Sequence, residues 1–442
     1  MKTERCEFTA FALPAGGRYA LKSIVQDALE ATESENCRCV NGKIHSGLGV
    51  FGVVNSAGST VPCEYEVKKI LPVAFEMNGR TGQAAALVDS NGEIRVYSEG
   101  VNAFVSNVQV ADGNVAICSY PGENGDGGVF VAAENGVFQT NLFSETYCIN
   151  HNASNAGVCH FKERVFFSCG QGVRYSNAGD YTDFQESAYG GGYISVGDGH
   201  GKVYQLLACD DAVLLFKERS VFKLYAAGAA DQFRVERLPY GGESIAAGSA
   251  ARCGKYVVFT ASNGDVYRLD GVHFEKIAEG VPYDFCQNFA ETASDGERYF
   301  RKGTFQTLVM EMDGSSYLSF SLQGLSDYDG MAVGVYDGFL VAYSPFSSLP
   351  SGVIASFFVK DLPLKDHAEK VVTKVTLFGS GRVGCRLDSE RRSVEKVAFL
   401  SKNGTSFEMQ QRGSRFDLKL TFGSRTVVEK IAVEFVRLGD EK

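Results

Sequence analysis

Apolar and polar residues follow one recurring order along most of this chain. In residues 206–228 an apolar run, 212–216, is followed by three charged residues and then by 220–225, where apolar and polar side chains alternate. An uninterrupted apolar run is typical of a strand packed on both faces, and alternation is typical of a strand with one solvent-facing side. The segment therefore predicts an antiparallel hairpin.

The same order of turn, apolar strand, turn and alternating strand recurs at intervals of about 40 to 50 residues, the length of one four-stranded propeller blade. Asn-Gly and Asp-Gly turns separate many of these strands, and Gly264 in Ser-Asn-Gly-Asp is expected to need a positive φ. One hairpin cannot bury both of its faces, whereas a closed ring of sheets can. We therefore predict an all-β chain whose main part is a β-propeller of about six or seven blades.

The two ends of the chain differ from the repeats. Residues 1–45 are expected to be an N-terminal segment with one short amphipathic helix at 21–32, and the propeller is expected to span 46–350. After two Pro-containing linkers, the strands alternate regularly again and basic residues become more frequent. Residues 368–442 therefore predict a small antiparallel β-sandwich, which a strand from before residue 370 can complete.

Composition narrows the classes of function. The net charge of −10 argues against sequence-independent nucleic-acid binding and against binding to an anionic membrane surface. No apolar stretch has the length of a signal peptide or a membrane span, so we expect no membrane insertion. The 12 Cys are scattered singly, apart from one Cys-x-Cys at Cys37 and Cys39, and are expected to be buried thiols of a protein made in the cytoplasm.

Several motifs resemble catalytic or binding sites, but each is incomplete. The loop 196–203 lacks the first glycine and the Ser or Thr of a phosphate-binding loop, and 123–128 lacks the ligand alternation of a calcium loop. Asp210 and Asp211 could serve a glycosidase, but at a turn they are more typical of solvated caps. The six His share no ligand spacing: His45, His151, His160, His200, His273 and His367. We predict no catalytic, cofactor-binding or metal-binding residue, no cofactor and no enzymatic activity.

Four segments resemble the virion propellers of tailed bacteriophages. These are 36–50, then 172–184 with its Tyr-Ser-x-x-Gly-Asp-x-x-Asp-Phe order, then 194–228 with a Gly-Asp-Gly turn and a Phe-Lys-Glu-x-Ser turn, and finally 249–271. The absence of Trp and the fairly short chain differ from the pattern of that family. The resemblance implies a structural role in the tail and carries over no catalytic residue.

The resulting hypothesis is a structural component of a phage tail. It would be synthesised in the host cytoplasm, reside in the virion tail near or at its nozzle, and associate with other tail proteins as a homo-oligomeric ring. The alternative is a tail-tip protein that binds a host receptor or surface polysaccharide, with the sandwich as the adhesive part. A propeller glycosidase is the least favoured hypothesis, since sialidase-type propellers would contain Trp-bearing repeats and this chain has no Trp. Tyr and Phe lie mostly in alternating strands, which favours core packing over a sugar-binding surface.

Overall fold

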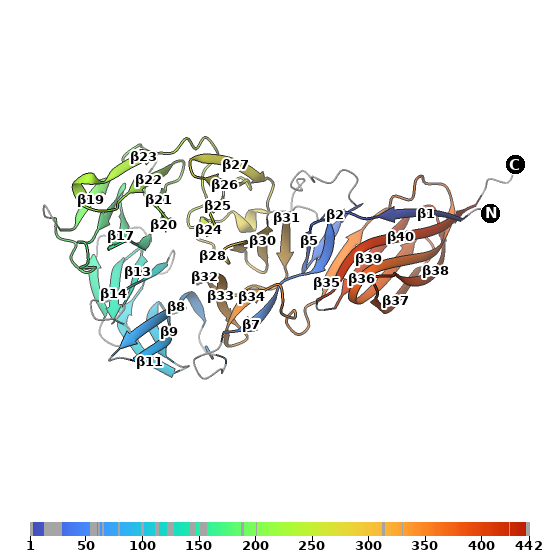
Figure 1. The fold of residues 1–442 in the computed structure, drawn as a ribbon, viewed down its shortest axis with the longest axis horizontal. Coiled ribbons are helices and arrows are strands. Elements are labelled where there is room, and N and C mark those ends of the chain that lie inside the picture. Colours follow the sequence, from blue (N-terminus) through green and yellow to red (C-terminus); the bar gives the residue numbers. More distant parts are fainter. Residues whose placement is uncertain are drawn as a thin grey trace.

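The computed structural model shows a ring of β-sheets joined side by side to a smaller β-structure that contains both ends of the chain (Figure 1). The structure describes residues 3–12, 29–53, 60, 62–63, 66–77, 80–98, 101–110, 115–121, 128–141, 146–150, 157–186, 190–199, 201–311, 314–328, 330–423 and 425–438. In this part of the chain the helices are two short 3-10 turns, Ala230–Gln232 and Tyr283–Phe285.

The ring is a β-propeller of seven four-stranded antiparallel blades. Blade 1 consists of β8 (Val67–Met77), β9 (Arg80–Asp89), β10 (Glu93–Ser98) and β11 (Val101–Gln109), and blade 2 of β12 (Ala116–Tyr120), β13 (Gly128–Ala133), β14 (Gly136–Asn141) and β15 (Thr146–Asn150). Blade 3 consists of β16 (Val158–Phe161), β17 (Arg164–Cys169), β18 (Gly172–Tyr175) and β19 (Gly192–Ser195). Blade 4 consists of β20 (Gln205–Ala208), β21 (Val213–Phe216), β22 (Val221–Tyr225) and β23 (Arg234–Arg237). Blade 5 consists of β24 (Ala251–Cys253), β25 (Tyr256–Thr260), β26 (Val266–Asp270) and β27 (His273–Ala278). Blade 6 consists of β28 (Thr292–Ser294), β29 (Tyr299–Lys302), β30 (Thr307–Glu311) and β31 (Gly314–Leu318). Blade 7 consists of β32 (Gln323–Tyr328), β33 (Met331–Tyr336), β34 (Phe339–Ser344) and β7 (Gly49–Gly52).

The apolar runs of the sequence are the second strands of the blades. Every residue of β13 and β21 is buried, because both faces of these strands pack against neighbouring blades. The hairpin predicted within 206–228 is β21–β22, with Val213 paired with Leu224. The predicted all-β propeller is therefore confirmed, and the number of blades is seven.

The ring is closed by a strand from before the first blade. β7 pairs antiparallel with β34, so that the outermost strand of blade 7 comes from residues 49–52, while its other three strands come from residues 323–344. Joining the two ends of the repeat region within one sheet leaves no unpaired gap between the first and last blades.

The smaller part is a β-sandwich built around one long strand, β36 (Lys370–Ser389). Its first half pairs with β38 (Thr405–Gly413) and β40 (Val427–Arg437), and its second half pairs with β37 (Ser393–Leu400) and β39 (Phe416–Phe422). Lys370 pairs with Gly413 and Ser389 pairs with Phe416, so that the two ends of β36 lie close together and its halves face each other. The strand bends at Gly379 and Gly381, where its partners change from β40 to β37 and β39. The backbones are close at this bend: a Cβ at Gly379 would lie 2.0 Å from the Val427 carbonyl oxygen.

The N-terminal residues are not a separate segment, as the sequence suggested, but part of this sandwich. β1 (Thr3–Phe8) pairs with β40, and β4 (Glu33–Glu35) pairs with β35 (Ala355–Val359). β5 (Cys37–Val40) pairs with β6 (Lys43–Ser46), which in turn pairs with β40. β35 is a strand from before residue 370 of the kind that the sequence allowed for, and with it the sandwich extends to before the predicted residue 368. Local patterning could not show this, because the partner strands are more than 300 residues apart in sequence.

The predicted helix at 21–32 lies largely outside the described residues, and its described end is not helical. Leu29–Glu30 is strand β3, which pairs with β2 (Phe11–Ala12). Leu29 is buried in the sandwich core with Phe11, and this tertiary burial outweighs the helical preference of the isolated sequence.

Candidate functional site: the central channel

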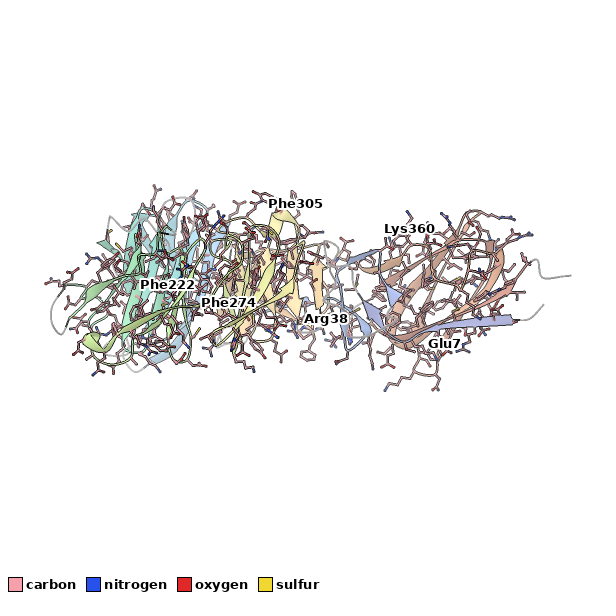
Figure 2. All side chains as sticks on the ribbon, turned by 90° about the horizontal axis from the view of Figure 1, so that it is seen from above. Glu7, Arg38, Phe222, Phe274, Phe305 and Lys360 are labelled. Carbon is pink, nitrogen blue, oxygen red and sulfur yellow. The ribbon has the colours of Figure 1, made fainter. Side chains whose placement is uncertain are left out.

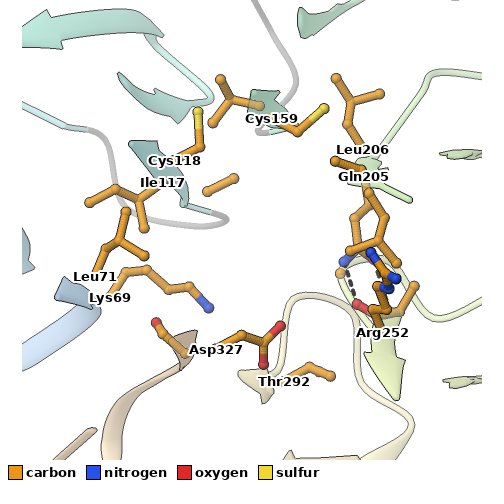
Figure 3. Close-up of a pocket in the computed structure, with 18 of the residues that line it drawn as sticks. Lys69, Leu71, Ile117, Cys118, Cys159, Gln205, Leu206, Arg252, Thr292 and Asp327 are labelled. Carbon is orange, nitrogen blue, oxygen red and sulfur yellow. Dashed lines mark hydrogen bonds between the residues drawn. The ribbon is translucent and has the colours of Figure 1, made fainter. Parts of the chain in front are cut away.

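The central channel of the propeller is a cavity of about 760 Å³ (Figure 3). Its wall is formed by the first strand of each blade and by the connections that precede these strands. Such channels are common ligand sites in ring-shaped folds, so the side chains that face this one decide what it can bind or catalyse.

Lys69 on β8 and Asp327 on β32 lie near each other on the channel wall (Figure 3). The Lys69 ammonium donates a hydrogen bond of 2.8 Å to the Leu325 carbonyl oxygen, and the Ser294 N–H donates to the Asp327 carboxylate. Asp327 is exposed in the channel, but enclosure by the surrounding strands raises the pKa of its carboxyl to about 6, against the opposing effects of Ser294 and Lys69. The same enclosure lowers the pKa of Lys69.

Glu291 stands beside this pair, immediately before β28. One carboxylate oxygen accepts a hydrogen bond of 2.6 Å from the Leu325 N–H, and the other forms an ion pair with Lys302. Both oxygens therefore hold neighbouring groups of the channel wall. Together with Lys69 and Asp327, Glu291 fastens the inner strands of blades 6, 7 and 1, where the ring closes.

The thiols and the amide of the wall offer little reactivity. Burial raises the pKa of the Cys118 thiol to about 12 and that of Cys159 well above its usual range, so both remain protonated and poorly nucleophilic. The Gln205 amide exchanges two hydrogen bonds with the Ala250 backbone, at 2.6 and 2.9 Å, and so joins blades 4 and 5. These groups act as contacts between blades.

The motifs weighed from the sequence have structural roles where the structure describes them. In the loop 196–203, Gly199 and Gly201 have φ of +78° and +79°, and Asp198 is engaged by Lys217 and Ser220. Asp210 and Asp211 are exposed and form ion pairs with Arg252 at 2.6 Å and Lys223 at 3.0 Å. His151, His200 and most of the loop 123–128 lie outside the described residues.

Metal ligands do not gather in the described part of the chain: nowhere in it do three His, Cys, Asp or Glu residues come together. Cys37 and Cys39 lie on β5, and burial raises the pKa of both thiols. The described helices include none that is long and apolar enough to span a membrane. Sequence patterns gave no signal for Lys69, Glu291 or Asp327, because each stands alone in an ordinary strand or turn.

Comparison with known proteins finds likeness in fold alone. No family model and no curated protein matches this chain. Among solved structures, BBS1N in complex with ARL6DN has 11% sequence identity and a TM-score of 0.44, covering 69% of this chain and 98% of that one. The β-propeller domain of Myceliophteria thermophila Cps50 (Swd1) has 10% identity and a TM-score of 0.44, with 67% and 99% covered. Chaetomium thermophilum Raptor has 12% identity and a TM-score of 0.43, with 67% and 28% covered.

Proposed function

We propose that this chain is a structural component of a bacteriophage tail, assembled with other virion proteins as a rigid propeller subunit in a homo-oligomeric ring. The resemblance of 172–184 and 194–228 to phage virion propellers motivates the proposal. The observation that carries it is the joint between propeller and sandwich, which fixes the two parts as one body.

Two chain connections and a group of buried or partly buried polar contacts form the joint. The chain begins in the sandwich, leaves it to form the propeller and returns to it, so that two connections cross the boundary. At the boundary, the Asn36 N–H donates to the Tyr317 carbonyl oxygen of β31 at 3.0 Å, and Arg38 forms an ion pair of 2.9 Å with Glu311 of β30. Buried or partly buried polar contacts of this kind resist hinge motion, as a load-transmitting subunit requires.

The channel supports the same proposal. Lys69, Asp327 and Glu291 each bond to a backbone group of a neighbouring blade across the ring closure, which is the arrangement expected of a structural core rather than of a substrate site. A propeller glycosidase would need two carboxylates poised on a sugar, whereas the Glu291 carboxylate holds Leu325 and Lys302.

A tail-tip protein that binds a receptor or polysaccharide is the second candidate function. Tyr283 and Phe305 are 75% and 80% exposed on adjacent loops. Asp284 holds these loops together by accepting two hydrogen bonds of 2.6 Å from Thr304. Exposed aromatic rings on fixed loops suit either a sugar face or a protein partner.

Location in the particle tests the proposal directly. Purified virions labelled with an antibody against this chain should carry the label on the tail, at a constant number of copies per particle. Absence of the chain from purified virions would overturn the proposal. Binding of the purified protein to host polysaccharide, lost in a variant with Tyr283→Ala and Phe305→Ala, would favour the tail-tip function instead.

A further inference from the structure

A second cavity, of about 720 Å³, lies between the propeller and the sandwich. Blades 5 and 6 form two of its sides, with Val258 on β25, Ile277 on β27 and Met310 on β30. The third side is β5 of the sandwich, which contributes Arg38 and Val40. Arg38 lies where the two parts of the molecule meet (Figure 2). We call this cavity the joint cleft. Small-molecule sites often have this size and lie at the boundary between two domains.

The floor of the joint cleft is the margin of an apolar core. Val258, Tyr299 and Met310 are buried in the core that blades 5 and 6 share, and Ile277 packs against that core. On β5, Val40 adds a partly buried side chain. An apolar ligand in the cleft would remove its own surface and that of these side chains from water, which is the main source of favourable free energy for such binding.

The charged side chains of the joint cleft mostly neutralise one another. Seven charged residues line it, and six of them form ion pairs among themselves: Arg38, Arg268, Glu275, Glu297, Arg298 and Glu311. The seventh, Lys255, is exposed and lies 4.7 Å from the centre of the Tyr256 ring. A charged ligand would have to be desolvated beside charges that are already paired, so the cleft favours an uncharged ligand.

One hydrogen-bond donor on the cleft wall lacks an acceptor. Arg38 donates from Nη1 to Glu311 at 2.9 Å, whereas its Nε is buried and has no hydrogen-bond partner among the described residues. The Arg38 side chain is only 13% exposed, so water is a poor substitute for the missing partner. A buried donor without an acceptor is unfavourable. An acceptor atom on a bound ligand would satisfy it.

We propose that the joint cleft binds an uncharged, mainly apolar small molecule that carries a hydrogen-bond acceptor, such as a carbonyl oxygen. Its apolar body rests on Val258, Ile277 and Met310, and its acceptor receives a hydrogen bond from Arg38. Because the propeller forms two sides of the cleft and the sandwich forms the third, the ligand contacts both parts and stabilises the joint between them. This site goes beyond the proposed role in a phage tail and does not depend on it.

Nile red is a suitable probe, because it is uncharged, carries a carbonyl oxygen and fluoresces strongly only in apolar surroundings. Titration of the full chain should show saturable binding at one site, and the melting temperature should rise with the concentration of Nile red. The dye 1-anilinonaphthalene-8-sulfonate is also apolar but carries a negative charge. It should bind at least about tenfold more weakly than Nile red.

Matched substitutions in two cavities locate the binding site. Ile277→Trp places a large side chain in the joint cleft and should lower the affinity for Nile red at least about tenfold. Ile117→Trp is the same change in the wall of the central channel and should leave the affinity unchanged. Phe399→Ser removes a ring that is 75% exposed on the sandwich and should also leave it unchanged, which excludes adsorption at this exposed ring.

Arg38→Lys separates the hydrogen bond to the ligand from the ion pair with Glu311. Lysine keeps a cation for Glu311 but has no Nε donor, so the affinity for Nile red should fall about fivefold, the usual effect of one lost hydrogen bond. Diphenylhexatriene, an apolar dye without an acceptor atom, should bind the wild type and Arg38→Lys equally well. Circular dichroism should show that all variants are folded. If Ile277→Trp is not, Val40→Trp fills the cleft from the sandwich side and should give the same loss.

Several results would overturn the inference. Binding of Nile red that does not saturate, or that survives filling of the cleft, would show that the cleft is not the site. Loss of binding in Ile117→Trp alone would place the dye in the central channel. Tighter binding of the sulfonate dye than of Nile red would contradict the uncharged class of ligand. Equal affinity of the wild type and Arg38→Lys for Nile red would contradict the hydrogen bond from Arg38.

Discussion

The Lys217 ammonium lies 2.6 Å from a carboxylate oxygen of Asp198, with both side chains almost fully buried between blades 3 and 4. The second oxygen of Asp198 accepts a hydrogen bond of 2.5 Å from the Ser220 hydroxyl, and Lys217 also donates to the Val196 carbonyl oxygen at 3.0 Å. The connection before blade 4 is thus fastened to the turn between β21 and β22. Both of the turns that resemble phage propellers, 197–199 and 216–220, meet at this ion pair.

Removing one partner of this pair should be costly. Lys217→Met leaves the Asp198 carboxylate buried without its cation, so the free energy of unfolding should fall by about 3 to 5 kcal/mol. The double variant with Asp198→Asn should lose less than the sum of the two single changes, which denaturant titration of all four proteins measures. Strictly additive losses would show that the two side chains do not depend on each other.

Gly264 illustrates a feature that sequence alone could predict in part. Its φ is +91°, as Ser-Asn-Gly-Asp suggested, but the connection is longer than a two-residue turn, since the Ala261 N–H bonds the Asp265 carbonyl oxygen. A Cβ at this position would also lie 2.6 Å from the Val281 carbonyl oxygen, in a different connection. The positive φ follows from local turn chemistry, whereas the crowding depends on a contact that no local pattern shows.

Gly264→Val should therefore destabilise the propeller by more than the strain of positive φ alone, which is about 1 kcal/mol. Gly271→Val is the matched control, because Gly271 has a φ of +62° and no atom within 4 Å of its Cβ position. Thermal unfolding should show a clearly larger loss for Gly264→Val. Equal losses would mean that the connection near Val281 moves aside freely.

Asn36 is the polar centre of the joint between the two parts. Its amide nitrogen donates to the Ser319 hydroxyl at 2.8 Å and to the Ile354 carbonyl oxygen at 2.9 Å, and its amide oxygen accepts from the Ser319 N–H at 2.7 Å. Asn36→Ala removes all three bonds in a buried place and should cost about 2 to 4 kcal/mol. Asn263→Ala, at an exposed turn, should cost far less.

The effect of Asn36→Ala should also be visible in cooperativity. Calorimetry of the wild type should give one transition, and the variant should unfold in two steps as propeller and sandwich separate. A single transition at an unchanged temperature would contradict the role of Asn36 as the fastening between the parts.

Prediction from sequence succeeded where the pairing strands lie close together along the chain and failed where they lie far apart. The β21–β22 hairpin and the strands after residue 370 could be predicted, because apolar runs and alternation are local consequences of burial. The pairing of β7 with β34 and of β1 with β40 could not, because each joins opposite ends of the chain and either strand alone fits many partners. The channel was missed for the same reason: Lys69 and Asp327 are unremarkable until the closed ring brings them together.

Asp327 gives the fold a pH dependence of defined sign. Its pKa is raised to about 6 in the folded chain from an ordinary value of 3.8, so the folded state holds this proton more tightly than the unfolded state. The contribution of Asp327 to stability is therefore most favourable at acid pH. It is lost progressively as the pH rises from about 4 to about 6, and is constant above that range.

Asp327→Asn should remove this dependence. An Asn oxygen can still accept the hydrogen bond from the Ser294 N–H, but it carries no charge that enclosure would penalise. Other carboxylates also titrate in this range, so the quantity to measure is the difference in melting temperature between variant and wild type from pH 4.5 to 8. This difference should increase in favour of Asp327→Asn as the pH rises to about 6 and then level off, whereas Asp211→Asn, at an exposed turn, should give a flat difference. A flat difference for Asp327→Asn as well, or one that falls with pH, would show that the channel does not penalise the Asp327 charge.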